Sequence, residues 1–228
     1  MGILTQVAEN VWRAETVFRI GPAFSMPVAS VITRDSAGKI TIISPIPFTD
    51  EQTAAINTRG PVVALVTPNQ FHHLSLPKAI ERWPNAKVWA APGLPEKRKD
   101  IHFDAVLGTG SDILNDYDTL FLEGTKRAAE IIFFHRPSRS LIIADLIFNI
   151  PNDPSLGWIG RLYLRFSHAL DKPGSSLFWR ILIRNRIAAA ASFQQILSFD
   201  FVRVLPAHGN VIETNARSTV EKVLRRMV

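Results

Sequence analysis

Short apolar runs and amphipathic segments alternate along the first 150 residues of the chain, a pattern typical of a protein that has both strands and helices. Residues 28–35 and 39–46 are rich in aliphatic and β-branched side chains and are joined by a Ser-Ala-Gly turn, which predicts a β-hairpin. Residues 49–60 begin with a threonine that can cap a helix, continue with two acidic residues and end at a glycine, which predicts a helix.

The other apolar runs extend this pattern. Residues 130–149 predict a second hairpin, with His135 in its solvated turn. The remaining predicted elements are strands over 61–68, 86–92 and 201–209 and helices over 76–83 and 216–228.

Residues 158–197 differ from the rest of the chain because the pattern there is wholly helical. It predicts two helices, over 158–170 and 176–199, separated by the breaker "DKPGS". Strands with interleaved helices, then a helical segment, then one strand and one helix fit two sheets between helices as well as a doubly wound sheet. Periodicity alone leaves both architectures open.

Composition narrows the possible chemistry. The 228 residues suit one domain, 1–228, with 158–197 as a helical insertion or lid within it. The chain has no cysteine, which excludes a cysteine nucleophile, a thiolate zinc site and a cysteine-held iron–sulfur cluster. The N-terminus lacks the features of a signal peptide, and no apolar run approaches the roughly 18 residues of a membrane span, so we expect a cytoplasmic protein.

Positive charge is concentrated in the C-terminal third. The formal net charge is +6 and the isoelectric point is about 10.0. Residues 151–228 contain 11 Lys or Arg and 5 Asp or Glu, whereas residues 1–150 contain 15 of each. The basic surface therefore belongs mainly to the segment that includes the helical insertion.

Polar residues follow three of the predicted strands at the points where they end. His72 and His73 follow the strand over 61–68, Asp145 follows "LIIA", and His208 follows "VRVLPA". Sites in α/β proteins are built at such strand ends. Imidazole and carboxylate ligands suit a first-row metal, although a histidine beside a glycine is also a common turn residue and an aspartate a common helix cap.

The segments that carry these residues resemble a known family. The order strand–turn–His-His, strand–Asp, strand–"PAHG" resembles the metallo-β-lactamase superfamily, which implies a four-layer αββα sandwich. More closely, "TPNQFHHLSL", "APGLPEKRKDIHFD", "FFHRPSRSLIIADLIFN" and "LPAHG" resemble an uncharacterised bacterial and plant branch of that superfamily. The resemblance covers about residues 8–212.

The first metal-binding motif of the superfamily, Thr-His-x-His-x-Asp-His, is degenerate in this chain. Thr67 matches, but Pro68 and Gln70 take the places of the first two histidines. His72 takes the place of the aspartate, and His73 keeps the last histidine.

The other family positions are changed in part. The aspartate of the early strand-end motif falls near Ser44, and the histidine of the Gly-His-Thr turn falls near Thr125. Asp145 and His208 are kept. The resemblance therefore implies that all ligands of the family's first metal are lost, whereas every position of the second metal still holds a residue able to bind one.

This pattern predicts a mononuclear site whose ligands are His72, His73, Asp145 and His208. We expect one divalent metal, with zinc first and iron or manganese as alternatives. Asp145 and His72 are the predicted catalytic residues. The resemblance implies a hydrolase of a small ester, lactone, thioester or phosphoester, and the alternative is a non-catalytic member that binds a ligand, a membrane surface or a protein partner.

Four further residues are candidates for substrate contact: Asn69, Gln70, Asn149 and His168. The insertion mixes aromatic residues with arginines, for which we rank a lid or substrate-pocket role first, a homodimer contact second and a peripheral membrane contact third. Binding of nucleic acid ranks last, because the chain lacks a nucleic-acid module. The expected partner is therefore a small-molecule substrate, and arginines beside the pocket would favour an anionic one.

Overall fold

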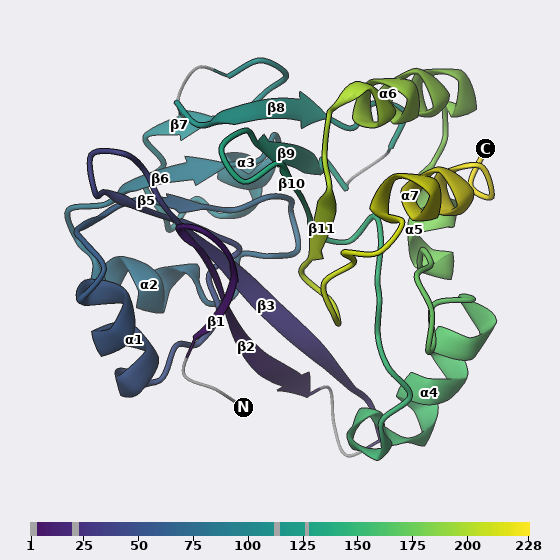
Figure 1. The fold of residues 1–228 in the computed structure, drawn as a ribbon, viewed down its shortest axis with the longest axis horizontal. Helices are drawn as coiled ribbons and strands as arrows, with labels where there is room; N and C mark the ends of the chain where they lie inside the picture. Colours follow the sequence, from purple (N-terminus) through teal and green to yellow (C-terminus); the bar gives the residue numbers. More distant parts are fainter. Residues whose placement is uncertain (1–3, 20–22, 112–114, 126–127) are drawn as a thin grey trace.

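The computed structural model describes residues 4–19, 23–111, 115–125 and 128–228, and in these ranges the chain forms two β-sheets enclosed by helices (Figure 1). The first sheet has the order β1-β2-β3-β4-β5-β6-β7, and the second has the order β11-β10-β9-β8. The strands of the first sheet are β1 (Thr5–Ala8), β2 (Val11–Arg19), β3 (Ser25–Arg34), β4 (Ile40–Ile43), β5 (Val62–Val66), β6 (Lys87–Ala90) and β7 (Ala105–Val106). Those of the second are β8 (Tyr117–Phe121), β9 (Ile131–His135), β10 (Ser140–Ile143) and β11 (Arg203–Pro206).

Both predicted hairpins are confirmed. Strands β3 and β4 pair antiparallel, as do β9 and β10. His135, however, is not in a solvated turn: it is the last residue of β9, it is buried, and its Nδ1 shares a hydrogen bond with the Ser138 hydroxyl at 2.7 Å. The strand continues one residue further than the turn pattern suggested.

Helices cover the outer face of each sheet. The helices are α1 (Asp50–Asn57), α2 (Leu76–Arg82), α3 (Leu94–Lys97), α4 (Gly157–Phe166), α5 (Leu177–Leu182), α6 (Arg186–Ser198) and α7 (Ala216–Leu224), with a 3-10 turn η1 at Pro154–Leu156. Among the described residues, none of these helices is both long and apolar enough to cross a bilayer. The predicted capping of α1 is confirmed, since Thr49 and Gln52 form a reciprocal capping box.

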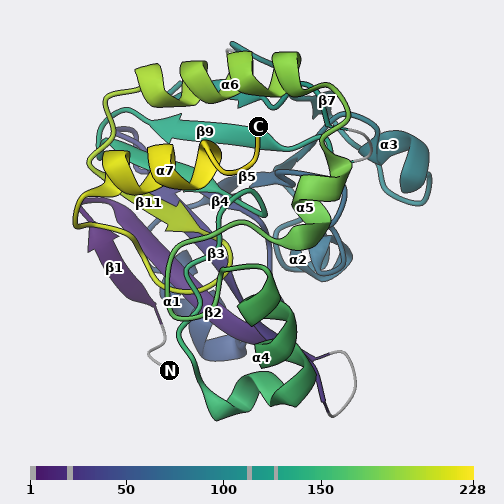
Figure 2. The same cartoon turned by 90° about the vertical axis from the view of Figure 1, so that its right-hand side faces the viewer.

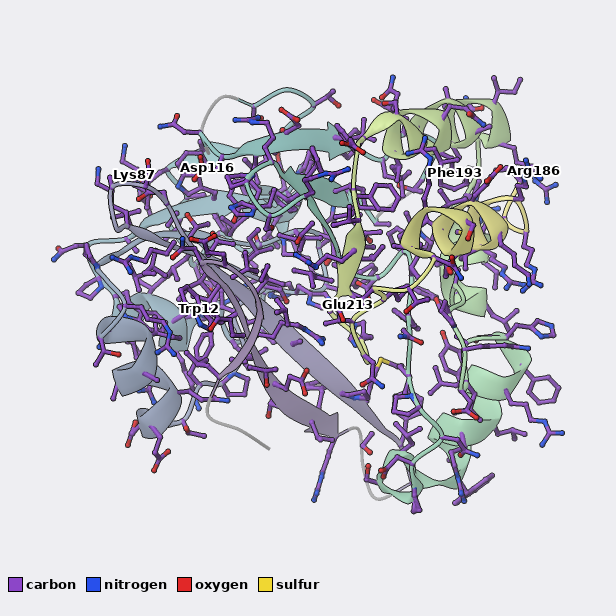
Figure 3. The ribbon with its side chains drawn as sticks, viewed as in Figure 1. Trp12, Lys87, Asp116, Arg186, Phe193 and Glu213 are labelled. Atoms are coloured by element: carbon purple, nitrogen blue, oxygen red, sulfur yellow. The ribbon has the colours of Figure 1, made fainter. Side chains whose placement is uncertain are left out.

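Three apolar layers hold the sandwich together. One lies between the first sheet and α1 and α2, and includes Ile56 and Leu76. The second lies between the two sheets and includes Val66 and Phe133. The third lies between the second sheet and the helices α6 and α7, where Phe193 is buried (Figure 3). The order of layers is therefore helix, sheet, sheet, helix, and the predicted αββα sandwich is the observed fold.

The segment 158–197 forms three helices rather than two. The second predicted helix is interrupted because the backbone N–H groups of Arg184 and Asn185 donate to the Gly124 carbonyl instead of continuing the helix. Asn185 then caps α6 by accepting from the Ala188 N–H at 3.1 Å. Helix α6 belongs to the outer layer of the sandwich, and Trp179 of α5 is buried in the same apolar layer, whereas α4 lies beside β3 (Figure 2).

Candidate metal centre

Three of the four predicted ligands come together where β5, β10 and β11 end. His72, Asp145 and His208 each offer one ligand atom, and these atoms lie within 4.8 Å of one another. The Nε2 of His208 lies 3.0 Å from one Asp145 oxygen, and the Nε2 of His72 lies 3.3 Å from the other. Two imidazole nitrogens and a carboxylate thus face one point, from three strand ends that are distant in the sequence.

Each imidazole is held through its other nitrogen. The Nδ1 of His208 lies 2.8 Å from the Pro27 carbonyl oxygen, which can only accept, so Nδ1 carries the proton. The Nδ1 of His72 shares a hydrogen bond of 2.6 Å with the Ser44 hydroxyl. In both rings Nε2 is therefore the nitrogen directed at the shared point. Histidine ligands of metals are usually oriented in this way, by a hydrogen bond to their other ring nitrogen.

The Asp145 carboxylate is fixed from two sides. Its Oδ2 accepts a hydrogen bond from the Asn69 side-chain amide at 2.6 Å. Below it, the buried Glu130 carboxyl group accepts from the backbone N–H groups of Ala144 and Asp145 at 2.9 and 3.1 Å. Both contacts position Asp145 and leave its other oxygen for His208 or an ion.

The charges at this point are strongly coupled. Burial alone would raise the pKa of Asp145, but His72 and His208 outweigh it and hold the pKa of that carboxyl group well below its usual range. Burial and the negative charge of Asp145 raise the pKa of Glu130 to about 8. Asp145 is thus the group that carries negative charge at neutral pH, as a metal ligand must.

His73 is not part of this group. Its Nδ1 lies 2.8 Å from the Arg98 guanidinium, which can only donate, so Nδ1 is an acceptor and its lone pair is occupied. Burial, with the charges of Lys97 and Arg98, lowers the pKa of His73 to about 4 and keeps the ring neutral. The structure therefore groups three of the four predicted ligands and leaves His73 outside this group, held instead by Arg98.

Asn69 lies beside the ligands but acts on them rather than on the cavity. It is fully buried, and its side-chain oxygen accepts from the backbone N–H groups of Phe71 and His72 at 2.9 and 3.0 Å. This Asx turn directs His72 toward Asp145 while the same side chain holds Asp145. Asn69 is a positioning residue.

The other predicted substrate contacts lie outside the cavity beside the ligands. Gln70 turns away and donates to the Pro92 carbonyl at 3.0 Å. Asn149 ties its own loop to the loop of His208 by donating to the Asn210 carbonyl at 3.0 Å. His168 is exposed and lines a separate surface hollow with Leu162 and other residues.

Two residues that the sequence did not single out hold the His208 loop. The buried Arg13 on β2 donates to the carbonyl oxygens of Pro206 and Gly209 at 3.0 and 2.7 Å. Gly209 has φ +91°, and a Cβ there would lie 2.0 Å from the Asn149 carbonyl oxygen. The "HG" pair of the sequence was the available signal for Gly209, whereas nothing in the sequence pointed to Arg13.

A cavity of about 410 Å³ opens over the three candidate ligands. Its remaining lining is mostly apolar, and includes Phe24, Met26, Val28, Ile46, Phe71 and Tyr163. Among the described residues, Asp145 is the one acidic residue of the lining, and no lysine or arginine lines it. A cluster of polar ligands on the wall of an apolar cavity is the usual form of a small-molecule site.

Comparison with known proteins supports the fold. The chain matches no protein-family model, and no curated protein matches it. Solved structures do match. The DIM-1 metallo-β-lactamase matches with a TM-score of 0.67 and 13% identity, over 99% of this chain and 97% of that chain. A metallo-β-lactamase from Pontibacter korlensis matches with a TM-score of 0.66 and 14% identity, over 97% of this chain and 98% of that chain. The metallo-β-lactamase FIM-1 from Pseudomonas aeruginosa in its mono-zinc form matches with a TM-score of 0.64 and 13% identity, over 98% of this chain and 94% of that chain. The chain therefore has the metallo-β-lactamase fold, as the resemblance predicted.

Proposed function

We propose that the protein is a mononuclear metal-dependent hydrolase that cleaves esters, thioesters or lactones with an apolar acyl group. The observation that carries this proposal is the convergence of His72, Asp145 and His208 on the wall of the apolar cavity. The sequence placed His72 and Asp145 in catalysis, and in this proposal they act through the ion that they hold.

The ligand set fits a divalent ion that binds nitrogen and oxygen. Two imidazoles and one carboxylate are the protein ligands of several catalytic zinc sites, with zinc as our first choice and iron or manganese as alternatives. Such an ion, when bound, supplies hydroxide near neutral pH and polarises a carbonyl oxygen. The mono-zinc form of FIM-1 supports a site with a single ion in this fold.

The residues of the chain supply orientation and an apolar environment. Asn69 holds the Asp145 oxygen and the Ser44 hydroxyl holds the His72 ring, so the ligands keep their directions. The apolar lining would bind an acyl chain and exclude water from it. Phosphoesters and other anionic substrates fit less well than the sequence suggested, because the described lining offers them no lysine or arginine.

A chain-length series tests this proposal. The zinc-loaded protein is assayed against p-nitrophenyl esters from acetate to octanoate, an acyl thioester, an acyl lactone and a phosphodiester. We expect kcat/KM to rise by up to about fourfold for each CH2 that the cavity buries, since a buried CH2 is worth about 0.8 kcal/mol. The phosphodiester should be the poorest substrate.

The His208→Ala variant is the control for background hydrolysis, and it should lose turnover of every substrate. Equal turnover by this variant would contradict the assignment of the site. Bound metal without turnover of any ester, thioester or lactone would favour the non-catalytic alternative, in which the same cavity only binds a ligand. The cytoplasmic location stays a prediction.

A further inference from the structure

We propose that helices α4 and α5 form a docking face for an anionic lipid surface. The docking face consists of exposed apolar side chains, namely Trp158, Ile159, Leu162, Phe166, Phe178 and Ile181. The proposal goes beyond the proposed hydrolase activity, because docking of this kind requires no metal.

Helix α4 presents its apolar stripe outward rather than into the core. Trp158, Leu162 and Phe166 are spaced four residues apart, so they share one face, and their exposed fractions are 65%, 46% and 63%. The core side of the same helix is formed by Gly160 and Leu164, which are buried. A surface helix normally hides its apolar stripe, so a second, exposed stripe calls for an external surface that covers it.

Helix α5 extends this face. Phe178 and Ile181 are exposed while Trp179 between them is buried, so α5 also has separate inner and outer sides. Both helices lie at the right-hand edge in Figure 1 and face the viewer in Figure 2. The two helices therefore lie on the same side of the molecule.

The charge around the docking face is almost entirely positive. Residues 154–187 contain six lysines or arginines and one aspartate. Arg165, Lys172 and the one aspartate, Asp171, line a surface hollow of about 620 Å³ together with Leu162 and Phe166 of the docking face, so cations outnumber anions there. Arg186 projects from the same edge of the molecule (Figure 3). Cations beside exposed aromatic and aliphatic groups are the composition of helices that lie on anionic membranes.

This charge favours a lipid surface over a second copy of the chain. A two-fold homodimer would bring the same patch of each copy together and would therefore place like charges against one another. An anionic bilayer complements the same charges, at about 1 kcal/mol for each lysine or arginine near its surface, which is about fivefold in affinity.

The docking face is continuous with the mouth of the cavity. Tyr163 of α4 lines the cavity, and Phe178 of α5 packs edge-on against Phe71 of the cavity lining, with ring centroids 5.8 Å apart. Phe18 and Leu74 line the cavity and are exposed at its rim. Docking would bring this apolar rim close to the lipid, which suits a substrate that partitions into membranes.

Vesicle flotation tests the proposal. The protein is mixed with vesicles of phosphatidylcholine alone or of phosphatidylcholine with phosphatidylglycerol, at low and at high salt. We expect flotation with the anionic vesicles, at least about tenfold weaker at high salt because screening reduces the attraction of exposed charges. The double variant Leu162→Gln, Phe166→Gln should weaken binding by at least about tenfold, since each side chain loses its apolar contact with the bilayer.

Two further variants make the test specific. The double variant Val106→Gln, Val202→Gln removes exposed apolar side chains outside the docking face and should float like the wild type. The His208→Ala variant should also float, so that failure of the metal site and failure of docking are distinguishable. Absence of flotation with anionic vesicles would overturn the proposal, as would sedimentation that shows a dimer which the Leu162→Gln, Phe166→Gln variant abolishes while vesicle binding is unaffected.

Discussion

Asn69 offers the sharpest test of how the metal centre is oriented. Its amide donates to Asp145 at 2.6 Å and its oxygen accepts from the N–H groups of Phe71 and His72. The substitution Asn69→Ala removes all three hydrogen bonds. Asn69→Ser keeps a hydroxyl that can accept from the turn, but that hydroxyl is too short to reach Asp145.

The magnitude follows from the bond to the carboxylate. A hydrogen bond to a charged group is worth about 1.5–3 kcal/mol. If all of this energy contributes to metal binding, its loss weakens the affinity by at most about 10–150-fold. Loss of a residue that orients a metal ligand usually costs about 10–100-fold. We therefore expect Asn69→Ala and Asn69→Ser to weaken zinc binding by about 10–100-fold, with the larger loss of affinity in Asn69→Ala.

The assay is competition for zinc against a chromophoric chelator, with thermal unfolding of each apo-protein to verify that it is folded. Gln70→Ala is the matched control, because the Gln70 amide donates to the Pro92 carbonyl and contacts no ligand. Wild-type affinity in Asn69→Ala, or an equal loss in Gln70→Ala, would refute the assignment of Asn69 as a positioning residue.

Three other substitutions test the contacts around the metal centre and the buried His135. Gly209→Ala should cost about 1–3 kcal/mol of unfolding free energy and weaken zinc binding, because the new Cβ collides with the Asn149 carbonyl beside His208; denaturant unfolding and chelator competition measure the two effects. Glu130→Ala should cost at least about 3 kcal/mol in denaturant unfolding, since it leaves buried N–H groups at Asp145 and its neighbours unpaired; a change below about 1 kcal/mol would contradict the role of Glu130. Burial and the charge of Arg136 lower the pKa of His135 to about 4. Below about pH 6.5 the unfolded chain therefore binds this proton more tightly than the folded chain, and the unfolding free energy falls as the pH decreases to about 4. His135→Gln should flatten this part of the curve of unfolding free energy against pH.

The sequence predicted the strands and helices that have strong local signals. Apolar runs marked β5, β10 and β11, and the threonine before α1 marked its capping box. The sequence assigned no strand to residues 5–19, although β1 and β2 lie there, because the alternation in that segment is interrupted by charged residues such as Arg13. Arg13 is buried because it binds carbonyl groups at the end of β11, and no local pattern reports a contact of that range.

The sequence predicted only part of the candidate site, for a similar reason. Strand ends and resemblance pointed to His72, Asp145 and His208, which the structure brings together. They also pointed to His73, whose direction depends on the Asx turn at Asn69 and on a guanidinium from a later segment. Which of two adjacent histidines faces a site is decided by such tertiary contacts, and the sequence alone does not contain a separate signal for them.

The three-residue metal site is tested most directly by the metal content of four purified proteins, measured by plasma mass spectrometry after loading with zinc and gel filtration. The proteins are the wild type, His72→Ala, His208→Ala and the matched control His73→Asn, whose side-chain oxygen can still accept from Arg98. We expect about one zinc per chain in the wild type and in His73→Asn, and loss of zinc in His72→Ala and His208→Ala. Zinc retained by His72→Ala and His208→Ala, or lost from His73→Asn, would contradict a site built from His72, Asp145 and His208.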